Sequence, residues 1–219
     1  GAGTSGAMLD EHAALSKAWP GVVEGMELIG STQVQGRASL VGNLCNASPA
    51  ADSVPALIAA RATCVIAGPK GQREAPVETI AVGPGKTSLA RDEMIIAFKL
   101  PKRPAHAADA YLRFIPRTEM DIAVVGAAVN VTLDGSGVCT DAMVVLGAVA
   151  PTAVIVPDAA KALIGSKLDD AALEKLDAAA RAACKPIDDK RGTIEYRTKV
   201  AGVLARRAAA IAFKRAGER

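Results

Sequence analysis

The segment from Arg37 to Asp52 combines small and polar residue types that could bind a phosphorylated ligand. Gly42 has no side chain, so a ligand can approach the backbone closely, and successive loop N–H groups can surround a phosphate. Ser39 and Asn43 add short polar side chains, and Asp52 could accept hydrogen bonds from ribose hydroxyls. A dinucleotide would use each of these features. The same residue types also form ordinary turns and helix caps, which the spacing alone favours.

The other side chains with reactive groups are few and fit structural roles. Only two histidines, His12 and His106, are present, and neither has cysteine or carboxylate neighbours at ligand spacing, so surface or packing roles are favoured. Asp188 and Asp189 precede basic residues, which is more typical of a helix cap with ion pairs than of an acid–base pair. Without Gly-x-Ser-x-Gly or Walker-type motifs, hydrolase and P-loop functions have no support. We therefore expect no catalytic side chain and no metal site.

The four cysteines lie too far apart in sequence for a CxxC pair, which argues against a cysteine metal site. Cys45 lies within the candidate ligand segment, where a thiol could react, but no base is visible nearby, so a small apolar filler is the favoured role. No stretch resembles a signal peptide, and no apolar run reaches the ~20 residues of a membrane span. These features predict a reduced, cytoplasmic chain.

The chain has 219 residues, of which 50% are hydrophobic, 22% are charged and only 3% are aromatic, with 46 alanines. This composition predicts a globular protein with a substantial core. The net charge of +3 is uneven: residues 191–219 hold eight Arg or Lys against two Glu, a balance of +6, which leaves −3 for residues 1–190. Aromatic residues suited to base stacking are scarce in the basic segment, which argues against nucleic-acid binding.

The pattern of residues 1–100 predicts helices followed by strands. A Ser5 N-cap and apolar positions at helical spacing predict a helix over 5–18, which ends at Trp19-Pro20-Gly21. Further helices are expected at 22–29 and 53–61, and strands at 63–67, 77–82 and 94–100. Residues 30–52 lack regular periodicity and are rich in turn formers, and such a long irregular segment is often functional.

The sequence from Pro101 to Pro104 is the best candidate for a domain boundary, because its paired prolines interrupt both helix and sheet. It divides the chain into domains at 1–103 and 104–219. After it, strands are expected at 111–115, 122–133 and 138–149, and helices at 158–163, 170–183 and 194–215. The turn sequence Asp134-Gly135-Ser136-Gly137 predicts a hairpin between the last two strands. The predicted fold class is α+β, and the second domain is expected to be a three-stranded antiparallel sheet packed with helices.

Two groups of motifs resemble a known family. The first comprises Ile29-Gly30-Ser31, Arg37–Asn43 and Asn46–Asp52, and the second comprises Tyr111, Arg113, Arg117, Asp121-Ile122-Ala123, Pro186–Asp189, Arg191-Gly192, Tyr196-Arg197, Val203-Leu204 and Arg206–Ala208. They resemble, respectively, the second FAD-binding motif and the C-terminal domain of the flavoprotein (medium) subunits of molybdenum hydroxylases, the carbon monoxide dehydrogenase and xanthine dehydrogenase family. The resemblance spans nearly the whole chain in one order. It implies that residues 1–103 are the middle lobe of a two-lobed FAD-binding domain.

The resemblance implies an FAD-binding electron-transfer subunit of a heterotrimeric oxidoreductase. In that family, electrons pass from iron–sulfur clusters, fed by a molybdopterin site, through FAD to an acceptor. The implied partners are an iron–sulfur small subunit and a molybdopterin large subunit. The implied cofactor-binding residues are Ser39, Leu40, Val41, Gly42 and Asn43 at the pyrophosphate, Asp52 at a ribose or ribityl hydroxyl, Tyr111 and Arg113 at the flavin, and Ile122 at the isoalloxazine, together with Asn46 and Ile95.

The sequence departs from the family pattern in three places. Val41 occupies a position where the family usually has a glycine, and Ser39 replaces the usual threonine while keeping a hydroxyl. The family's first Gly-rich FAD motif lies in an N-terminal lobe that would precede Gly1, and truncation, cleavage or a separate polypeptide would each explain its absence. We expect this chain alone to be inactive.

One alternative function is an apo assembly module that contacts the other subunits without retaining FAD. A free-standing flavin reductase fits the C-terminal pattern poorly. If the FAD assignment holds, replacing Asp52 with alanine is expected to weaken FAD retention and leave folding intact, since the position is predicted to lie in a loop.

Overall fold

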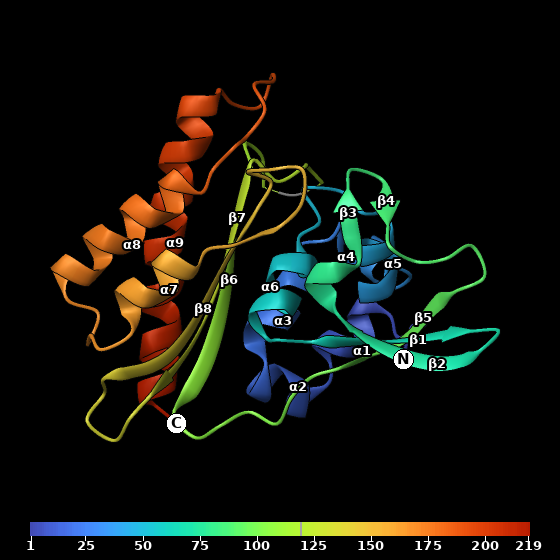
Figure 1. The fold of residues 1–219 in the computed structure, drawn as a ribbon, viewed down its shortest axis with the longest axis horizontal. Coiled ribbons are helices and arrows are strands. Elements are labelled where there is room, and N and C mark those ends of the chain that lie inside the picture. The colour runs from blue at the N-terminus through green and yellow to red at the C-terminus, as the bar shows by residue number, and fades with distance from the viewer. Residues whose placement is uncertain (119) are drawn as a thin grey trace.

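The computed structural model describes residues 1–118 and 120–219, and Figure 1 shows two halves that lie side by side. The first half carries short helices around a small sheet, and the second half carries a longer antiparallel sheet covered by helices. The predicted boundary at 103/104 falls in the linker that joins the last strand of the first half to the first strand of the second. This linker runs along the bottom edge of Figure 1.

The predicted helix over 5–18 is in fact two helices, α1 (Gly6–Asp10) and α2 (Ala13–Ala18). Ser5 caps α1 as the sequence predicts. His12 caps α2 through its Nδ1, which accepts a backbone N–H at 3.1 Å. A capping residue has non-helical backbone angles, so this cap interrupts the helix and gives His12 a structural role.

Helices α3 (Pro20–Glu27) and α6 (Ser53–Ala59) lie where helices were predicted. The segment 30–52, expected to be irregular, contains the short helices α4 (Thr32–Gln35) and α5 (Leu40–Cys45). Helices of one or two turns are too short to show a periodic pattern in the sequence. The irregular segment is therefore partly helical, and its second helix presents the candidate ligand motif.

Two predicted strands of the first half are confirmed as β1 (Thr63–Gly68) and β5 (Met94–Lys99). An unpredicted strand, β2 (Gly71–Pro76), pairs with β1 on its other side, so the antiparallel order is β2-β1-β5. All but one of the β2 residues are exposed, which removes the alternation that marks a half-buried strand. A separate hairpin pairs β3 (Ala81–Gly83) with β4 (Lys86–Thr87).

The predicted strand over 77–82 is correct only for Ala81 and Val82, which begin β3, because Val77–Thr79 form a 3-10 turn. Val77 and Ile80 are both fully buried. A spacing of three places two side chains on one side of a 3-10 turn, whereas in a strand they would point to opposite faces. Burial of both side chains in one core therefore selects the turn.

The second half is built on β6 (Ala107–Phe114), β7 (Val125–Leu133), β8 (Cys139–Gly147) and β9 (Val154–Ile155), which pair antiparallel in that order. The first three correspond to the predicted strands, and the two-residue β9 adds a short edge. The predicted hairpin turn follows β7, where Asp134 Oδ1 accepts two backbone N–H groups at 2.8 and 3.0 Å.

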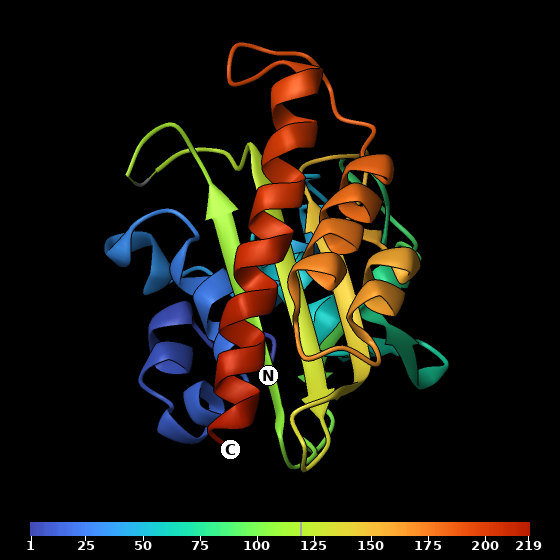
Figure 2. The same cartoon turned by 90° about the vertical axis from the view of Figure 1, so that its left-hand side faces the viewer.

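Helices α7 (Pro157–Leu163), α8 (Asp170–Ala182) and α9 (Ile194–Gly217) cover one face of this sheet, as predicted, and α9 runs along its length in Figure 2. The buried face of α9 is mainly alanine: Ala201, Ala205, Ala208, Ala209, Ala212 and Ala216. Small side chains let a helix approach a sheet closely, so the alanine-rich composition builds a dense core with few aromatic rings. No helix in the described part of the chain is long and apolar enough to cross a membrane.

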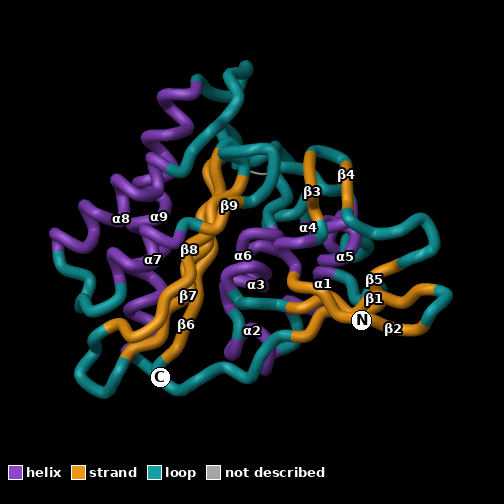
Figure 3. The backbone as a smooth tube through the Cα atoms, in the orientation of Figure 1, coloured by secondary structure: helices purple, strands orange, loops and turns teal. Residues whose placement is uncertain are grey.

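The other face of the long sheet packs against the first half, where α3 and α6 lie beside β6 and β7 (Figure 3). Strand β7 is consequently buried on both faces. Val125, Ala127 and Val129 belong to the core shared with α9, and Ala128 belongs to the core of the first half. This two-sided burial explains the near-continuous apolar run in the β7 sequence, and it joins the halves through one central layer.

Candidate functional site

The segment predicted to bind phosphate forms the beginning of α5. Ser39 caps this helix: its Oγ accepts the Gly42 N–H at 3.1 Å, and its carbonyl oxygen accepts the Asn43 N–H at 3.0 Å. The first N–H groups of a helix have no intrahelical acceptors, which leaves those of Leu40 and Val41 for a ligand. Gly42 is exposed, and among the described residues a Cβ built there would meet only Ser39 Oγ, at 3.3 Å. The segment is therefore both a helix cap and an open stretch of backbone.

The side chains of this segment serve mainly to hold it in place. Leu40 is buried in the first core, so it can offer a ligand only its backbone. The Asn43 Oδ1 accepts a hydrogen bond from the Ser53 hydroxyl at 2.7 Å, which ties α5 to the start of α6. Asn46 ends α5 and is exposed. The motif is thus anchored on one side and open to solvent on the other.

Asp52 lies at the start of α6 and is buried against β6. Its Oδ1 accepts a hydrogen bond from the Tyr111 hydroxyl at 3.0 Å, and its Oδ2 pairs with Arg113 Nη1 at 2.8 Å. The same Arg113 nitrogen also donates to the Leu28 carbonyl oxygen at 2.7 Å. The structure brings together three residues that the sequence assigned separately to a cofactor. It also shows that both carboxylate oxygens of Asp52 already have a partner within the chain.

Burial dominates the electrostatics of this group. It raises the pKa of the Asp52 carboxyl to about 6, against the opposing effects of the Arg113 guanidinium and the Tyr111 hydroxyl. Burial also raises the pKa of Tyr111 well above its ordinary value. At neutral pH the Tyr111 hydroxyl therefore stays protonated and donates a hydrogen bond to the ionised Asp52 carboxylate. The group orients side chains and offers no free nucleophile.

Glu24 on α3 completes this arrangement, although sequence reasoning did not select it. Its Oε2 accepts the backbone N–H of Tyr111 at 2.8 Å, and its Oε1 pairs with Arg215 at 2.5 Å near the end of α9. The edge strand β6 therefore has one of its free N–H groups satisfied by a side chain. The only signal in the sequence was a carboxylate in the middle of α3, directly after the apolar pair Val22-Val23.

A cleft of about 420 Å³ lies between the two halves. The first half contributes Ser48, Pro49, Ala50 and Pro84, and the second half contributes Ile122, Ala123, Ile187 and Arg191. The Ile122 side chain is 52% exposed at this cleft. The structure thus brings Ile122 together with the end of the first motif. Apolar walls with charged side chains at the rim suit a planar aromatic ring whose polar edge faces outward.

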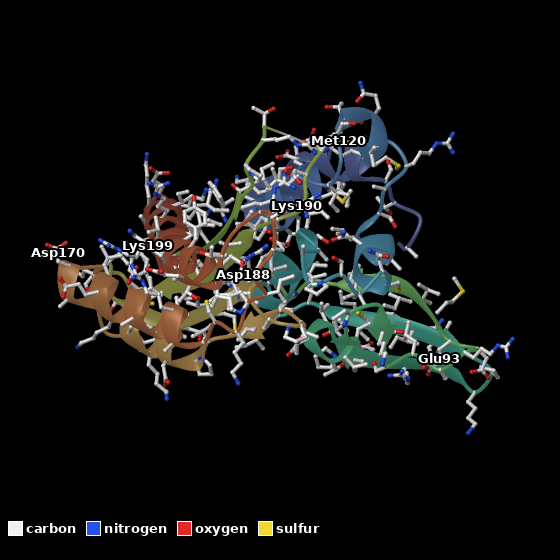
Figure 4. All side chains as sticks on the ribbon, turned by 90° about the horizontal axis from the view of Figure 1, so that it is seen from above. Glu93, Met120, Asp170, Asp188, Lys190 and Lys199 are labelled. Carbon is white, nitrogen blue, oxygen red and sulfur yellow. The ribbon has the colours of Figure 1, made fainter. Side chains whose placement is uncertain are left out.

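The loop that carries Ile187 is fixed by buried charge. Arg197 is buried and pairs with Asp189 at 2.7 Å while it donates to the Val124 carbonyl oxygen at 2.8 Å. The expected ion pair is therefore confirmed for Asp189, but the expected helix cap is wrong, because Thr193 caps α9. Figure 4 shows this loop at Asp188 and Lys190, seen from above.

Burial shows where the remaining residues singled out in the sequence lie. Ile95 is 2% exposed within the core beside β1, so its side chain is covered. Cys45 is exposed, so its favoured role as an apolar filler is wrong, because the preceding residue, Leu44, occupies the buried position of that turn. His106 is exposed with a φ of 51° and lies in the linker. Within residues 1–118 and 120–219, no three His, Cys, Asp or Glu side chains gather as a metal site.

Comparison with known proteins gives matches over nearly the whole chain. A family model for the FAD binding domain in molybdopterin dehydrogenase matches residues 1–103, and one for the CO dehydrogenase flavoprotein C-terminal domain matches residues 110–212. The carbon monoxide dehydrogenase medium chain of Afipia carboxidovorans is 34% identical over 96% of this chain and 74% of its own length. The xanthine dehydrogenase FAD-binding subunit of Escherichia coli O157:H7 is 27% identical over 99% of this chain and 74% of its own length.

Solved structures match at the level of the fold and the sequence. Reconstituted CO dehydrogenase from Oligotropha carboxidovorans contains a chain that superimposes with a TM-score of 0.93 and 33% identity, covering 98% of this chain and 74% of that one. The carbon monoxide dehydrogenase of Hydrogenophaga pseudoflava contains a chain with a TM-score of 0.93 and 30% identity, covering 98% of this chain and 74% of that one.

Proposed function

The chain belongs to the family of FAD-binding medium subunits of molybdenum hydroxylases, and from this premise we propose that it binds FAD and passes electrons through it to an acceptor. FAD, when bound, supplies the redox chemistry of this oxidoreductase subunit. The chain's own residues bind and orient the cofactor. None of the proposed site residues has to act as a nucleophile or a general acid.

The residues present fit one side of an FAD molecule. The open backbone from Ser39 to Asn43 suits the pyrophosphate, because unpaired N–H groups at a helix start favour anionic oxygens. The apolar cleft at Ile122 suits the isoalloxazine ring. A carboxylate oxygen has more than one lone pair, so Asp52 can accept a sugar hydroxyl while it holds Arg113. Asn46 and the backbone around Ile95 complete the proposed set.

One observation carries the proposal: the Asn43–Ser53 hydrogen bond sets the open start of α5 beside the buried group of Asp52, Tyr111 and Arg113. Residues of both matched domains therefore meet next to one exposed stretch of backbone. The family resemblance assigns four of these residues, Asn43, Asp52, Tyr111 and Arg113, to the cofactor. This convergence supports a single binding surface.

The relatives named as medium chains and FAD-binding subunits suggest the partners. We extend to this chain an iron–sulfur small subunit and a molybdopterin large subunit, with electrons arriving from the iron–sulfur clusters. A cytoplasmic location belongs to the same proposal, supported by the four free thiols in the described residues. The division at 103/104 into a middle lobe and a C-terminal domain is also proposed.

The test uses the protein purified with the chains that it assembles with, and measures flavin per chain from the absorption bands. Gly42→Val places a branched side chain on the open backbone of α5, so this variant is expected to lose most of its flavin. Gly3→Val is the matched control, because a Cβ at exposed Gly3 meets no neighbour among the described residues within 4 Å. An assembled protein that contains no flavin and takes up no added FAD would contradict the proposal.

A second candidate function is an apo assembly module that contacts its partners without retaining FAD. Both carboxylate oxygens of Asp52 and the side-chain oxygen of Asn43 already accept hydrogen bonds within the chain, and this observation favours the assembly module. Under this alternative, the partner chains copurify in full amount while flavin is absent, and Gly42→Val changes neither result.

A further inference from the structure

Two loops of the second half meet at the rim of the cleft. One joins β6 to β7 and carries Ile122, and the other joins α8 to α9 and carries Ile187. Figure 4 shows the two loops beside each other from above, where Met120 marks the first and Lys190 the second. The second loop also contributes Arg191 to the lining of the cleft. Contacts between these loops can therefore set the position of Ile122.

Asp121 is the anchor of the first loop. Its side chain is only 8% exposed, and its Oδ1 accepts the backbone N–H of Ile122 at 2.7 Å. The same oxygen accepts the Arg191 Nε–H of the second loop at 3.2 Å. The hydrogen bond from the Ile122 N–H lowers the pKa of the Asp121 carboxyl, and Arg191 adds to this effect, so the group is ionised at neutral pH. One carboxylate oxygen thus joins the Ile122 backbone to a cation on the other loop.

Arg191 is itself held by the core of the second half. Its backbone N–H donates to the Asp189 Oδ1 at 2.8 Å, and Asp189 is the ion-pair partner of the buried Arg197 on α9. The Arg191 side chain is 24% exposed, so water screens its pairing with Asp121 only in part. A continuous series of charge-assisted hydrogen bonds therefore runs from α9 to the backbone of Ile122.

A second cation, Arg117, contacts the same carboxylate more weakly. Its Nε lies 3.4 Å from the Asp121 Oδ2, and its side chain is 65% exposed. Its Nη2 donates at 2.7 Å to the carbonyl oxygen of Met120, whose φ of 55° lies in the left-handed region. Such a backbone is unfavourable and persists only where neighbouring contacts hold it. Arg117 therefore shapes the loop locally, whereas Arg191 ties the loop to the rest of the fold.

We propose that Arg191 is a positioning residue of the proposed FAD site: acting through Asp121, it fixes Ile122 as one wall of the cleft that receives the flavin ring. This inference rests on the proposed function. Ile122 is 52% exposed and lies outside both cores of the described residues, so packing alone does not fix it. A wall that is ordered before binding lowers the entropic cost of binding a planar ring. Loss of the ion pair therefore weakens the hold on the ring without removing Ile122 itself.

The test uses the protein purified with the chains that it assembles with. Arg191→Gln removes the charge that pairs with Asp121. Lys190→Gln is the matched control, because Lys190 is the neighbouring exposed cation and does not line the cleft. Amide hydrogen exchange at Ile122 is the first measurement, and about three- to tenfold faster exchange is expected in Arg191→Gln alone. If Arg191→Gln fails to fold, Asp121→Asn decides, since it removes the ion pair and keeps an acceptor for the Ile122 N–H.

The bound flavin gives the second measurement. Visible circular dichroism reports the asymmetry of the surroundings of the ring, and the flavin bands are expected to weaken in Arg191→Gln. Titration of the flavin-free complex with FAD is expected to give about three- to tenfold weaker binding in the same variant. Arg191→Lys is expected to restore both, because the contact with Asp121 is a single hydrogen bond that an ammonium group can also make.

The two measurements separate the possible results. Faster exchange with an unchanged flavin spectrum and affinity would show that the loop loosens without affecting the ring, and would overturn the proposal. Unchanged exchange, or an equal effect in Lys190→Gln, would show that Arg191 does not specifically hold Ile122, with the same consequence. Unmodified protein that takes up no FAD would contradict the proposed function as well. Flavin-containing protein with an unaffected Arg191→Gln variant would contradict only the positioning role.

Discussion

Asp52 and Arg113 come from different halves of the chain and form a buried ion pair at 2.8 Å. The pair joins the start of α6 to β6, and the Tyr111 hydroxyl adds a further bond to the same carboxylate. A contact of this kind has two consequences. It sets the relative position of the two matched domains at the proposed FAD site. It also means that residues of this site contribute to the stability of the fold.

The first prediction concerns the loss of this carboxylate. Asp52→Ala leaves the Arg113 guanidinium buried without its counter-charge, so we expect the free energy of unfolding to fall by about 3 kcal/mol or more. This corrects the expectation from the sequence that folding would be intact. Urea unfolding measures the change, with Asp188→Ala as an exposed control. An Asp52→Ala variant as stable as that control would show that Arg113 finds another partner.

The second prediction concerns pH. The folded-state pKa of Asp52, about 6, lies above the ordinary value of 3.8 because burial favours the neutral acid. The folded chain then binds this proton more tightly than the unfolded chain, so the stability contributed by Asp52 falls as pH rises from about 4 to about 6. Carboxyl NMR shifts, compared with those of Asp52→Asn, should titrate near 6. A midpoint below 3.8 would show that the Arg113 ion pair outweighs burial.

A third prediction addresses the loop that carries Ile187. Arg197 is held by Asp189 and by the Val124 carbonyl oxygen, so Arg197→Lys loses its forked geometry while keeping the charge. We expect stability to fall by about 1.5 to 3 kcal/mol, together with faster amide exchange in residues 187–193. Arg207→Lys, on an exposed position of the same helix, is the control and should change neither measurement. Unchanged exchange in Arg197→Lys would mean that other contacts fix the loop.

A fourth prediction probes the packing between the halves. A Cβ at Gly147 would lie 2.8 Å from the Pro55 Cγ, so β8 and α6 approach each other closely there. Gly147→Ala is expected to lower the free energy of unfolding by about 1 to 3 kcal/mol through overpacking. Gly135→Ala, in the exposed hairpin turn with no neighbour within 4 Å among the described residues, should have little effect. Thermal denaturation of the two variants compares them directly, and equal melting temperatures would refute tight packing at this contact.

The elements that the sequence predicts correctly are those in which burial of a face leaves a recognisable pattern of apolar residues. The long strands β6, β7 and β8 and the helices α8 and α9 were expected within a few residues of their ends. The failures occurred where a local feature overrides periodicity. His12 interrupts a helix by capping the next one, and Val77 and Ile80 are buried on one side of a 3-10 turn rather than on a strand.

The sequence alone also determined the open backbone at Ser39 and Gly42, because capping and a missing side chain are local properties of consecutive residues. Only the tertiary structure decided that Asp52 pairs with Arg113, that Glu24 holds Tyr111, and that Arg103 stacks on Trp19 beneath the linker. Each of these contacts joins positions far apart in the chain. Their formation depends on how two cores pack against one central sheet, and no local pattern of residue types encodes that packing.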